Sequence, residues 1–219
     1  MLGIIYLTIV RKDRQIMGDT KQKILEVSLD LFSQKGFSAV SIRDICAQVK
    51  IKESSVYYHF KNKQAIFDEL ICHFEQVATD MMTQLEQAFA EQPCFIEKPF
   101  YQIVCDTFFE NYFMDDFCNK IMRLLLIEQF GNSEVQKIYD RWMFTEPLEF
   151  QSKMFYALME IGIIPHTDSA YLAVKYYAPI HFFALRWLFR GTLSEEQKNA
   201  FRKAAYQHIE KFFGEIEVA

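Results

Sequence analysis

The sequence predicts an all-α protein. Only seven of its 219 residues are Gly and five are Pro, which is too few for a sandwich or barrel with a turn about every 8–12 residues. Most of the chain repeats apolar residues at intervals of three and four, as amphipathic helices do. A hydrophobic fraction of 51% is enough to build a sizeable core. We therefore expect helices throughout, in one domain or in a small domain followed by a larger one.

Three helices are expected first. A cap at residue 19 or 20 begins a helix that ends at Gly36, because Gly readily takes the left-handed conformation favoured at a helix C-terminus. Ser41 and Asp44 have the spacing of a capping box, and they open a second, short helix that runs to about residue 49. After a short polar turn, a third helix covers about residues 53–58.

Longer helices follow these three. From residue 63 to about residue 90, apolar side chains form one stripe, which predicts a helix of about 40 Å that starts at an Asn62 cap. Pro147 and Pro179 should break or kink the helices that contain them. The later helices are expected over residues 97–113, 116–130, 133–161, 168–190 and 194–213.

Charge is distributed unevenly along the chain. Residues 1–63 carry 11 Lys and Arg against 6 Asp and Glu, whereas residues 64–219 carry 13 against 23. A basic N-terminal quarter on an acidic chain indicates a small anion-binding module joined to a body that repels polyanions, although an excess of this size also arises by chance.

Two short helices joined by a tight turn inside the basic segment predict a helix-turn-helix. In this motif the second helix reaches base edges in the major groove, while the first crosses the DNA backbone. Ser41 begins the first helix, where unpaired N–H groups can bind a phosphate. The pattern therefore predicts a double-stranded DNA operator as a partner. The candidate contact residues at the turn and on the second helix are Lys52, Glu53, Ser54, Ser55, Tyr57, Tyr58 and His59.

The same segment resembles the N-terminal domain of tetracycline-repressor-type (TetR family) regulators over roughly residues 20–67. The resemblance is carried by Thr20, Ile24, Leu31-Phe32, Gly36-Phe37 and the stretches 41–46 and 56–63. It implies a helix-turn-helix DNA-binding domain over residues 17–63 and a larger helical ligand-binding and dimerisation domain over residues 64–219. Residues 1–16 are then an upstream extension or a disordered arm, with translation starting at either Met1 or Met17.

The resemblance also implies roles for single residues. Ser41, Tyr57, His59 and the Lys63 amide would contact the DNA backbone, and Ser54, Ser55 and Tyr58 would lie near the bases, with Arg43 at the edge of the groove. Together with Lys52 these residues form the predicted DNA-binding set.

The chain departs from the family pattern in two places. The turn usually reads Gly-Val-Ser and is Lys50-Ile51-Lys52 here, so we expect a turn of different shape, because Lys does not readily adopt a positive φ. Ser54 replaces a frequent Gly. Structural roles also remain open for Tyr57 in the core, for His59 as a hydrogen-bonding residue between helices, and for Glu53 as a charge that favours the helix dipole.

The segment 64–219 is dense in aromatic and Met side chains. By resemblance it encloses a cavity, and such walls suit a small apolar or aromatic effector. The same side chains would also fill a solid core. The predicted pocket residues are Phe74, Met81, Phe108, Phe109, Tyr112, Met122, Trp142, Phe155, Met159 and His181.

The last two predicted helices carry broad apolar stripes. By resemblance these helices form a four-helix bundle with a second copy around a two-fold axis, giving a homodimer. The alternative is that the stripes pack within one subunit. The predicted dimer residues are Tyr171, Val174, Phe182, Leu185, Phe189, Phe201, Ala205, His208 and Phe212.

Other classes of function find less support. No Ser-His-Asp, paired-carboxylate or His-Glu-x-x-His motif indicates an enzyme, and five Cys without a Cys-x-x-Cys pair predict neither a metal nor a cofactor. No run of 18 apolar residues predicts a membrane span. The apolar residues 1–10 precede a charged cluster instead of following one, which is the wrong order for a signal peptide.

The sequence therefore favours a cytoplasmic, ligand-responsive repressor that is not an enzyme and has no membrane partner. An activator or a helical interaction protein that uses the same motif remains an alternative. An enzyme that uses the helical cavity is a weaker alternative.

Overall fold

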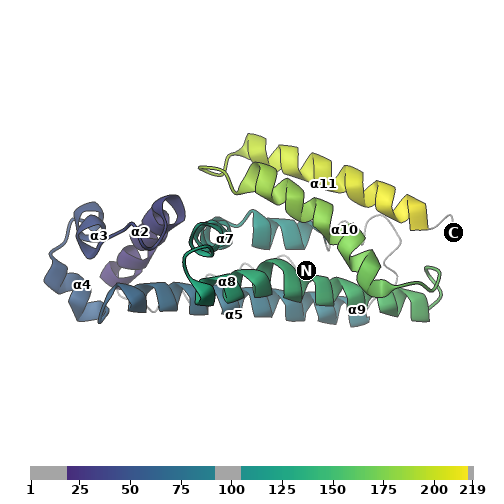
Figure 1. The fold of residues 1–219 in the computed structure, drawn as a ribbon, viewed down its shortest axis with the longest axis horizontal. Helices are drawn as coiled ribbons and strands as arrows, with labels where there is room; N and C mark the ends of the chain where they lie inside the picture. Colours follow the sequence, from purple (N-terminus) through teal and green to yellow (C-terminus); the bar gives the residue numbers. More distant parts are fainter. Residues whose placement is uncertain (1–18, 92–104, 217–219) are drawn as a thin grey trace. The chain divides into compact units, whose positions relative to one another are not determined.

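The computed structural model describes residues 19–91 and 105–216. Over these residues the protein is all-helical, as predicted (Figure 1). The chain divides into two compact units, one ending at Ile71 and the other beginning at Cys72. We expected the division at residue 63, where α5 (Lys63–Glu91) begins. It lies inside α5 because residues such as Ile66 and Phe67 are buried in the N-terminal unit, with Phe67 packed on Phe37.

The N-terminal unit consists of α2 (Asp19–Lys35), α3 (Ile42–Val49), α4 (Glu53–His59) and the first turns of α5. Gly36 ends α2 with a φ of 85°, and its N–H donates to the carbonyl of Phe32. Asn62 caps α5, because its side-chain oxygen accepts the N–H of Ala65 at 2.9 Å. The core of this unit is made of Ile24, Leu29, Phe32, Val40, Ile45, Val49, Val56, Phe60, Ile66 and Leu70.

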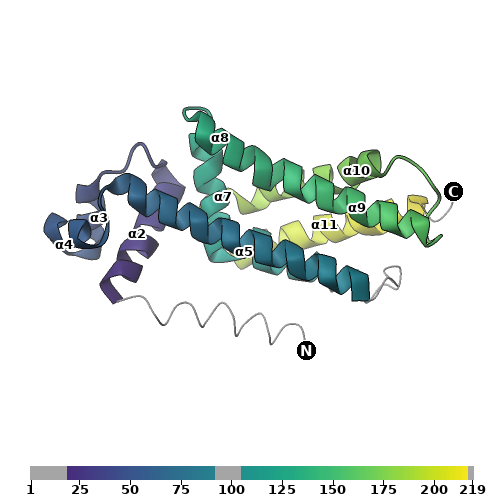
Figure 2. The same ribbon diagram turned by 90° about the horizontal axis from the view of Figure 1, so that it is seen from below.

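The C-terminal unit contains the rest of α5 and a set of helices packed around one aromatic core. Figure 2 shows α5 and the helix made of α8 and α9 along one side of this unit. Residues 105–108 are helical, and residues 97–104 of the predicted 97–113 helix lie outside the described residues. The other elements are η1 (Phe109–Phe113), α7 (Asp116–Glu128), α8 (Ser133–Asp140), η2 (Arg141–Thr145), α9 (Glu146–Glu160), α10 (Ser169–Phe183), η3 (Ala184–Leu188) and α11 (Glu195–Ile216).

Three of these elements are π-helical segments, which periodicity did not predict. The segment η2 joins α8 to α9 in one helix, and η3 extends α10, so the expected 133–161 and 168–190 helices are both present with a π turn inside. Pro147 lies at the start of α9. A proline lacks the N–H that would bond a carbonyl one turn earlier. A π turn in this position accommodates the missing hydrogen bond.

Buried side chains satisfy the carbonyls of the π segments. The hydroxyl of Tyr112 donates to the carbonyl of Trp142 at 2.9 Å, and that of Tyr177 donates to the carbonyl of Met143 at 3.1 Å. Asn119 donates to the carbonyls of Phe113 and Leu188, which end η1 and η3. These bonds fix the π segments within the core, because a buried carbonyl without a partner is costly.

Candidate nucleic-acid interface and ligand site

The N-terminus of α3 is built by a capping box between Ser41 and Asp44. The Ser41 N–H donates to the Asp44 carboxylate at 2.8 Å, and the Asp44 N–H donates back to the Ser41 hydroxyl at 3.2 Å. The same hydroxyl donates to Asp44 at 2.6 Å. The side-chain and backbone bonds from Ser41 lower the pKa of Asp44. The hydroxyl of exposed Ser41 is therefore already engaged. Among the described groups of this first turn, the N–H groups of Ile42 and Arg43 are the donors left for a phosphate.

The turn between α3 and α4 keeps a left-handed residue although it has no glycine. Lys50 has φ 64° and ψ 45°, and its N–H donates to the carbonyl of Cys46. Among the described residues other than Gly it alone has a positive φ. Such a conformation costs a lysine about 1 kcal/mol. We expected a different turn from this residue, but Lys50 takes the conformation that a Gly would take.

The helix α4 presents an exposed face and a buried one. Val56 is fully buried and Phe60, which follows the helix, is 3% exposed, whereas Tyr57 and Tyr58 are 52% and 84% exposed. Tyr57 is thus not a core residue. Tyr57 and Tyr58 are adjacent in the sequence, so this short helix offers two large aromatic side chains to a partner. Lys52 and Ser54 are also exposed, and Ser55 and His59 are half-buried on the same helix.

Two further predicted residues are tied to neighbouring groups. Arg43 lies on α3, and its Nε donates to Oε1 of Glu53, the first residue of α4, at 3.2 Å. Lys63 donates from Nζ to the carbonyls of Phe37 and Val40, both at 2.7 Å, and lies 4.2 Å from the centre of the Phe37 ring. The side chain of Lys63 therefore holds the loop between α2 and α3, while its backbone lies in the first turn of α5.

Sequence reasoning missed both of these contacts. The bond between Arg43 and Glu53 joins residues 10 positions apart, and the two bonds of Lys63 join residues 23 and 26 positions apart. Helical periodicity relates only residues that are three or four positions apart, so it does not predict these bonds. The positive balance predicted for this segment also depends on Arg11, Lys12 and Arg14, which lie outside the described residues. Near α4 the exposed cations are Arg43, Lys50, Lys52 and Lys61.

The predicted pocket residues form a packed core. Phe108 is half-buried and the other nine are buried. Phe74 stacks on Tyr112 at 6.0 Å and meets Trp142 edge-on at 5.9 Å. The cavity beside this core has a volume of about 20 Å³, and of the predicted set only Phe108 and Phe109 line it. This space holds about one water, far below the roughly 300 Å³ at the lower end for ligand sites.

His181 is the exception within this core. It is 6% exposed, it lies 5.0 Å from the Phe144 ring, and neither of its ring nitrogens has a hydrogen-bond partner among the described residues. Burial lowers the pKa of His181 to about 4. The side chain is therefore neutral at physiological pH.

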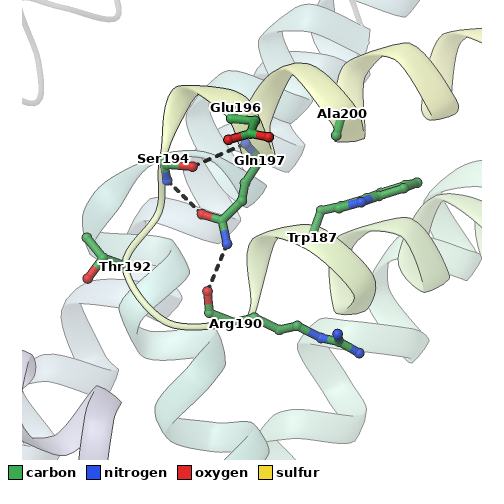
Figure 3. Close-up of a pocket in the computed structure, with 7 residues that line it drawn as sticks. All are labelled: Trp187, Arg190, Thr192, Ser194, Glu196, Gln197 and Ala200. Carbon is green, nitrogen blue, oxygen red and sulfur yellow. Dashed lines mark hydrogen bonds between the residues drawn. The ribbon is translucent and has the colours of Figure 1, made fainter.

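A larger hollow lies elsewhere in the C-terminal unit. It has a volume of about 550 Å³, is open to solvent, and lies at the turn before α11 (Figure 3). Gln197 closes this turn by accepting the N–H of Ser194 and by donating to the carbonyl of Arg190. None of the predicted pocket residues lines this hollow. Among the described residues, no group of three or more His, Cys, Asp or Glu could hold a metal ion.

The predicted dimer residues divide into a stripe on α10, one half-buried histidine and a buried group. Tyr171, Val174 and Phe182 form an exposed stripe on α10 and are 64%, 47% and 54% exposed, and half-buried Leu185 continues it. Half-buried His208 bonds through Nε2 to the carbonyl of Tyr176 at 2.9 Å. The others are buried inside their own unit: Phe189, Phe201, Ala205 and Phe212. No described helix is both long and apolar enough to span a bilayer.

Comparisons with known proteins agree with this geometry. The family model for bacterial regulatory proteins of the tetR family matches residues 24–70. The chain is 24% identical, over 88% of its length and 98% of the relative's, to IcaR, the negative transcriptional regulator of the biofilm operon icaADBC in Staphylococcus epidermidis.

Two solved structures share the fold. A protein from Mesorhizobium loti described as a TetR-family transcriptional regulator aligns with a TM-score of 0.64 and 18% identity, over 89% of this chain and 95% of the other. The transcriptional regulator FadR from Bacillus subtilis, solved in complex with stearoyl-CoA, aligns with a TM-score of 0.61 and 16% identity, over 87% and 96% of the two chains.

Proposed function

The chain belongs to the TetR family of transcriptional regulators, and from this premise we propose that it is a homodimeric repressor released from its operator by a small apolar molecule. The exposed face of α4 is the observation that carries the DNA-binding part. Tyr57 and Tyr58 project from a short helix whose other side is anchored by buried Val56. A rigid helix with exposed aromatic and small polar side chains suits the major groove. We also propose that the protein acts in the cytoplasm, because a repressor must reach its operator.

Homodimerisation rests on the α10 stripe. Tyr171, Val174 and Phe182 are exposed at helical spacing, and a second copy that presents the same stripe would bury them around a two-fold axis. Each protomer has one helix-turn-helix, so two protomers are needed to read two half-sites. The buried residues of the predicted dimer set, such as Phe201, then stabilise the unit that carries the stripe.

The effector part requires the aromatic core to open. The present cavity of about 20 Å³ admits no effector, so a ligand must select a state in which side chains around Phe108 and Tyr176 move apart. An apolar or aromatic molecule matches these walls. The stearoyl-CoA of the B. subtilis FadR structure is bound by a protein of the same fold. Its stearoyl chain is long and apolar, although its coenzyme A group is polar and charged, and it is the acyl chain that supports the choice of an effector with a large apolar part.

A gel shift tests the DNA-binding part. Labelled DNA from upstream of the protein's own gene should be retarded by the wild type, and Tyr58→Ala should weaken retardation at least tenfold. Tyr156→Ala is the matched control, because Tyr156 is 56% exposed on α9 and should leave binding unchanged. Equal effects of the two substitutions would contradict the role of α4. An enzyme or a DNA-independent interaction protein would show no retardation at all.

A further inference from the structure

The contact between Arg43 and Glu53 brings opposite charges together on the face expected to meet DNA. Arg43 is the second residue of α3 and Glu53 is the first residue of α4, and the bond runs from Nε to Oε1 at 3.2 Å. The Arg43 side chain is 86% exposed and that of Glu53 is 45% exposed. An exposed pair of this kind contributes little to stability. An acidic residue in the first turn of α4 also gains about 0.3–1 kcal/mol from the helix dipole, so folding gives only a small reason for a carboxylate here.

A carboxylate is also unfavourable for affinity at this place. DNA presents one negative charge about every 1.7 Å of helix axis, and a protein carboxylate beside it is repelled. Glu53 stands at the N-terminus of α4, and the N-terminal residues of a recognition helix are those that contact base edges. A charge that lowers affinity at this position can still raise selectivity, because it penalises base pairs that offer it no donor.

Arg43 and Glu53 each keep hydrogen-bonding atoms that their mutual bond does not use. Arg43 bonds to Glu53 through Nε only, and no other described group bonds to its two terminal nitrogens. The second carboxylate oxygen of Glu53 is likewise an open acceptor among the described residues. The terminal nitrogens of Arg donate to O6 and N7 of guanine, and a carboxylate accepts from N4 of cytosine. One G·C pair presents these acceptors and this donor side by side in the major groove.

We propose that Arg43 and Glu53 act together as a specificity element that reads one G·C base pair in each half-site. This inference rests on the proposed DNA-binding function, and it names the base pair that Arg43 and Glu53 select in each half-site. Glu53 holds the guanidinium in place through Nε and accepts from cytosine, while Arg43 donates to guanine. It also follows that Glu53 lowers affinity for DNA in general and raises affinity for the correct site.

Selection from a randomised duplex library, followed by sequencing and fluorescence anisotropy, tests the proposal. The wild type should select a G·C pair at one position of each half-site. Glu53→Gln should reduce the preference for that pair about tenfold and shift it toward A·T, because an amide matches adenine N6 and N7. The same variant should bind unselected duplex more tightly than the wild type does. Arg43→Ala should lose the preference at the same position.

Two variants separate geometry from charge. Glu53→Asp keeps the charge on a shorter side chain, so it should lose the preference without tighter binding to unselected duplex. Glu26→Gln removes a charge from exposed Glu26 on α2, whose partner is Gln22, and should leave the preference intact. Circular dichroism melts check that each variant folds.

The selection experiment distinguishes a failure of the specificity element from a failure of the proposed DNA-binding function. If the wild type enriches no sequence, the proposed function itself is contradicted, and this inference falls with it. If the wild type selects a site but Glu53→Gln keeps the same preference, or if Glu53 and Arg43 variants change different positions, only the specificity element is overturned.

Discussion

The ammonium of Lys63 donates to the carbonyl of Val40 at 2.7 Å and thereby ties the start of α5 to the loop before α3. A second bond, to the carbonyl of Phe37, strengthens this link. The N-terminus of α3 begins directly after Val40, at Ser41. The position of a predicted phosphate-binding group therefore depends on a side chain far along the sequence.

Lys63→Met should weaken binding to every DNA sequence without changing the salt dependence. The Lys63 ammonium donates to two backbone carbonyls instead of neutralising a phosphate, so the slope of log affinity against log salt should stay the same. Loss of two charge-assisted bonds should lower the free energy of unfolding by about 2 kcal/mol. Fluorescence anisotropy at several salt concentrations and urea denaturation provide the two readouts.

Lys61→Met is the matched control for this substitution. Lys61 is exposed, so its loss should leave stability unchanged and reduce the salt slope by about 0.9 if it neutralises one phosphate. A reduced slope for the Lys63 variant with unaltered stability would show that Lys63 contacts DNA directly.

Lys50→Gly should stabilise the protein by about 1 kcal/mol. Lys50 is held at a φ of 64°, and Gly adopts this conformation without the steric cost. Lys50→Ala removes the same charge but keeps the strain, so the difference between the two variants in urea denaturation isolates the backbone effect. Equal stabilities would mean that the left-handed conformation carries no cost here.

Tyr177→Phe should destabilise the protein by about 1–3 kcal/mol, because it leaves the buried Met143 carbonyl without its 3.1 Å bond. The cost should fall in a Pro147→Ala background, since alanine restores an N–H near the π segment. A double-mutant cycle in thermal or urea unfolding measures this coupling. Additive changes in the free energy of unfolding would show that Pro147 and the Tyr177 hydrogen bond are energetically independent.

Acid should weaken the fold through His181. Its folded pKa is lowered to about 4 from 6.5 by burial, so the unfolded chain binds a proton first as pH falls through 6.5. The contribution of neutral His181 to the free energy of unfolding is fully present above about pH 6.5. It is lost as the pH falls toward 4, which lowers the free energy of unfolding by up to about 3 kcal/mol. His181→Leu should flatten the unfolding free energy across this window. If His181→Leu has the same pH dependence as the wild type, groups other than His181 cause the loss of stability in acid.

Local signals in the sequence were enough to predict most of the fold. The capping box of Ser41 and Asp44, the Asn62 cap and the Gly36 terminus each depend on neighbours within a few positions. The π segments were not predictable, because their carbonyls are satisfied by residues such as Tyr112, 30 positions from Trp142.

The candidate sites were less predictable than the helices. An apolar pattern identifies a core but does not say whether the core is hollow, so Phe74 and Trp142 fit a pocket and a packed cluster equally well. The helix α10 is apolar on several sides, so its sequence did not separate exposed Val174 from buried Ile180. The Arg43 contact depends on how α3 and α4 pack, which periodicity does not encode.

Hydroxyl-radical footprinting on DNA from upstream of the protein's own gene tests both halves of the proposed function in one experiment, because it reports the binding of α4 in the groove and the presence of a dimer together. A dimeric repressor should protect two half-sites with two-fold symmetry, centred about one helical turn or slightly more apart, near 34–36 Å. Tyr58→Ala should abolish both half-sites together, since each copy contributes one α4. A single protected site would contradict the dimer, and protection that survives Tyr58→Ala would contradict binding through α4.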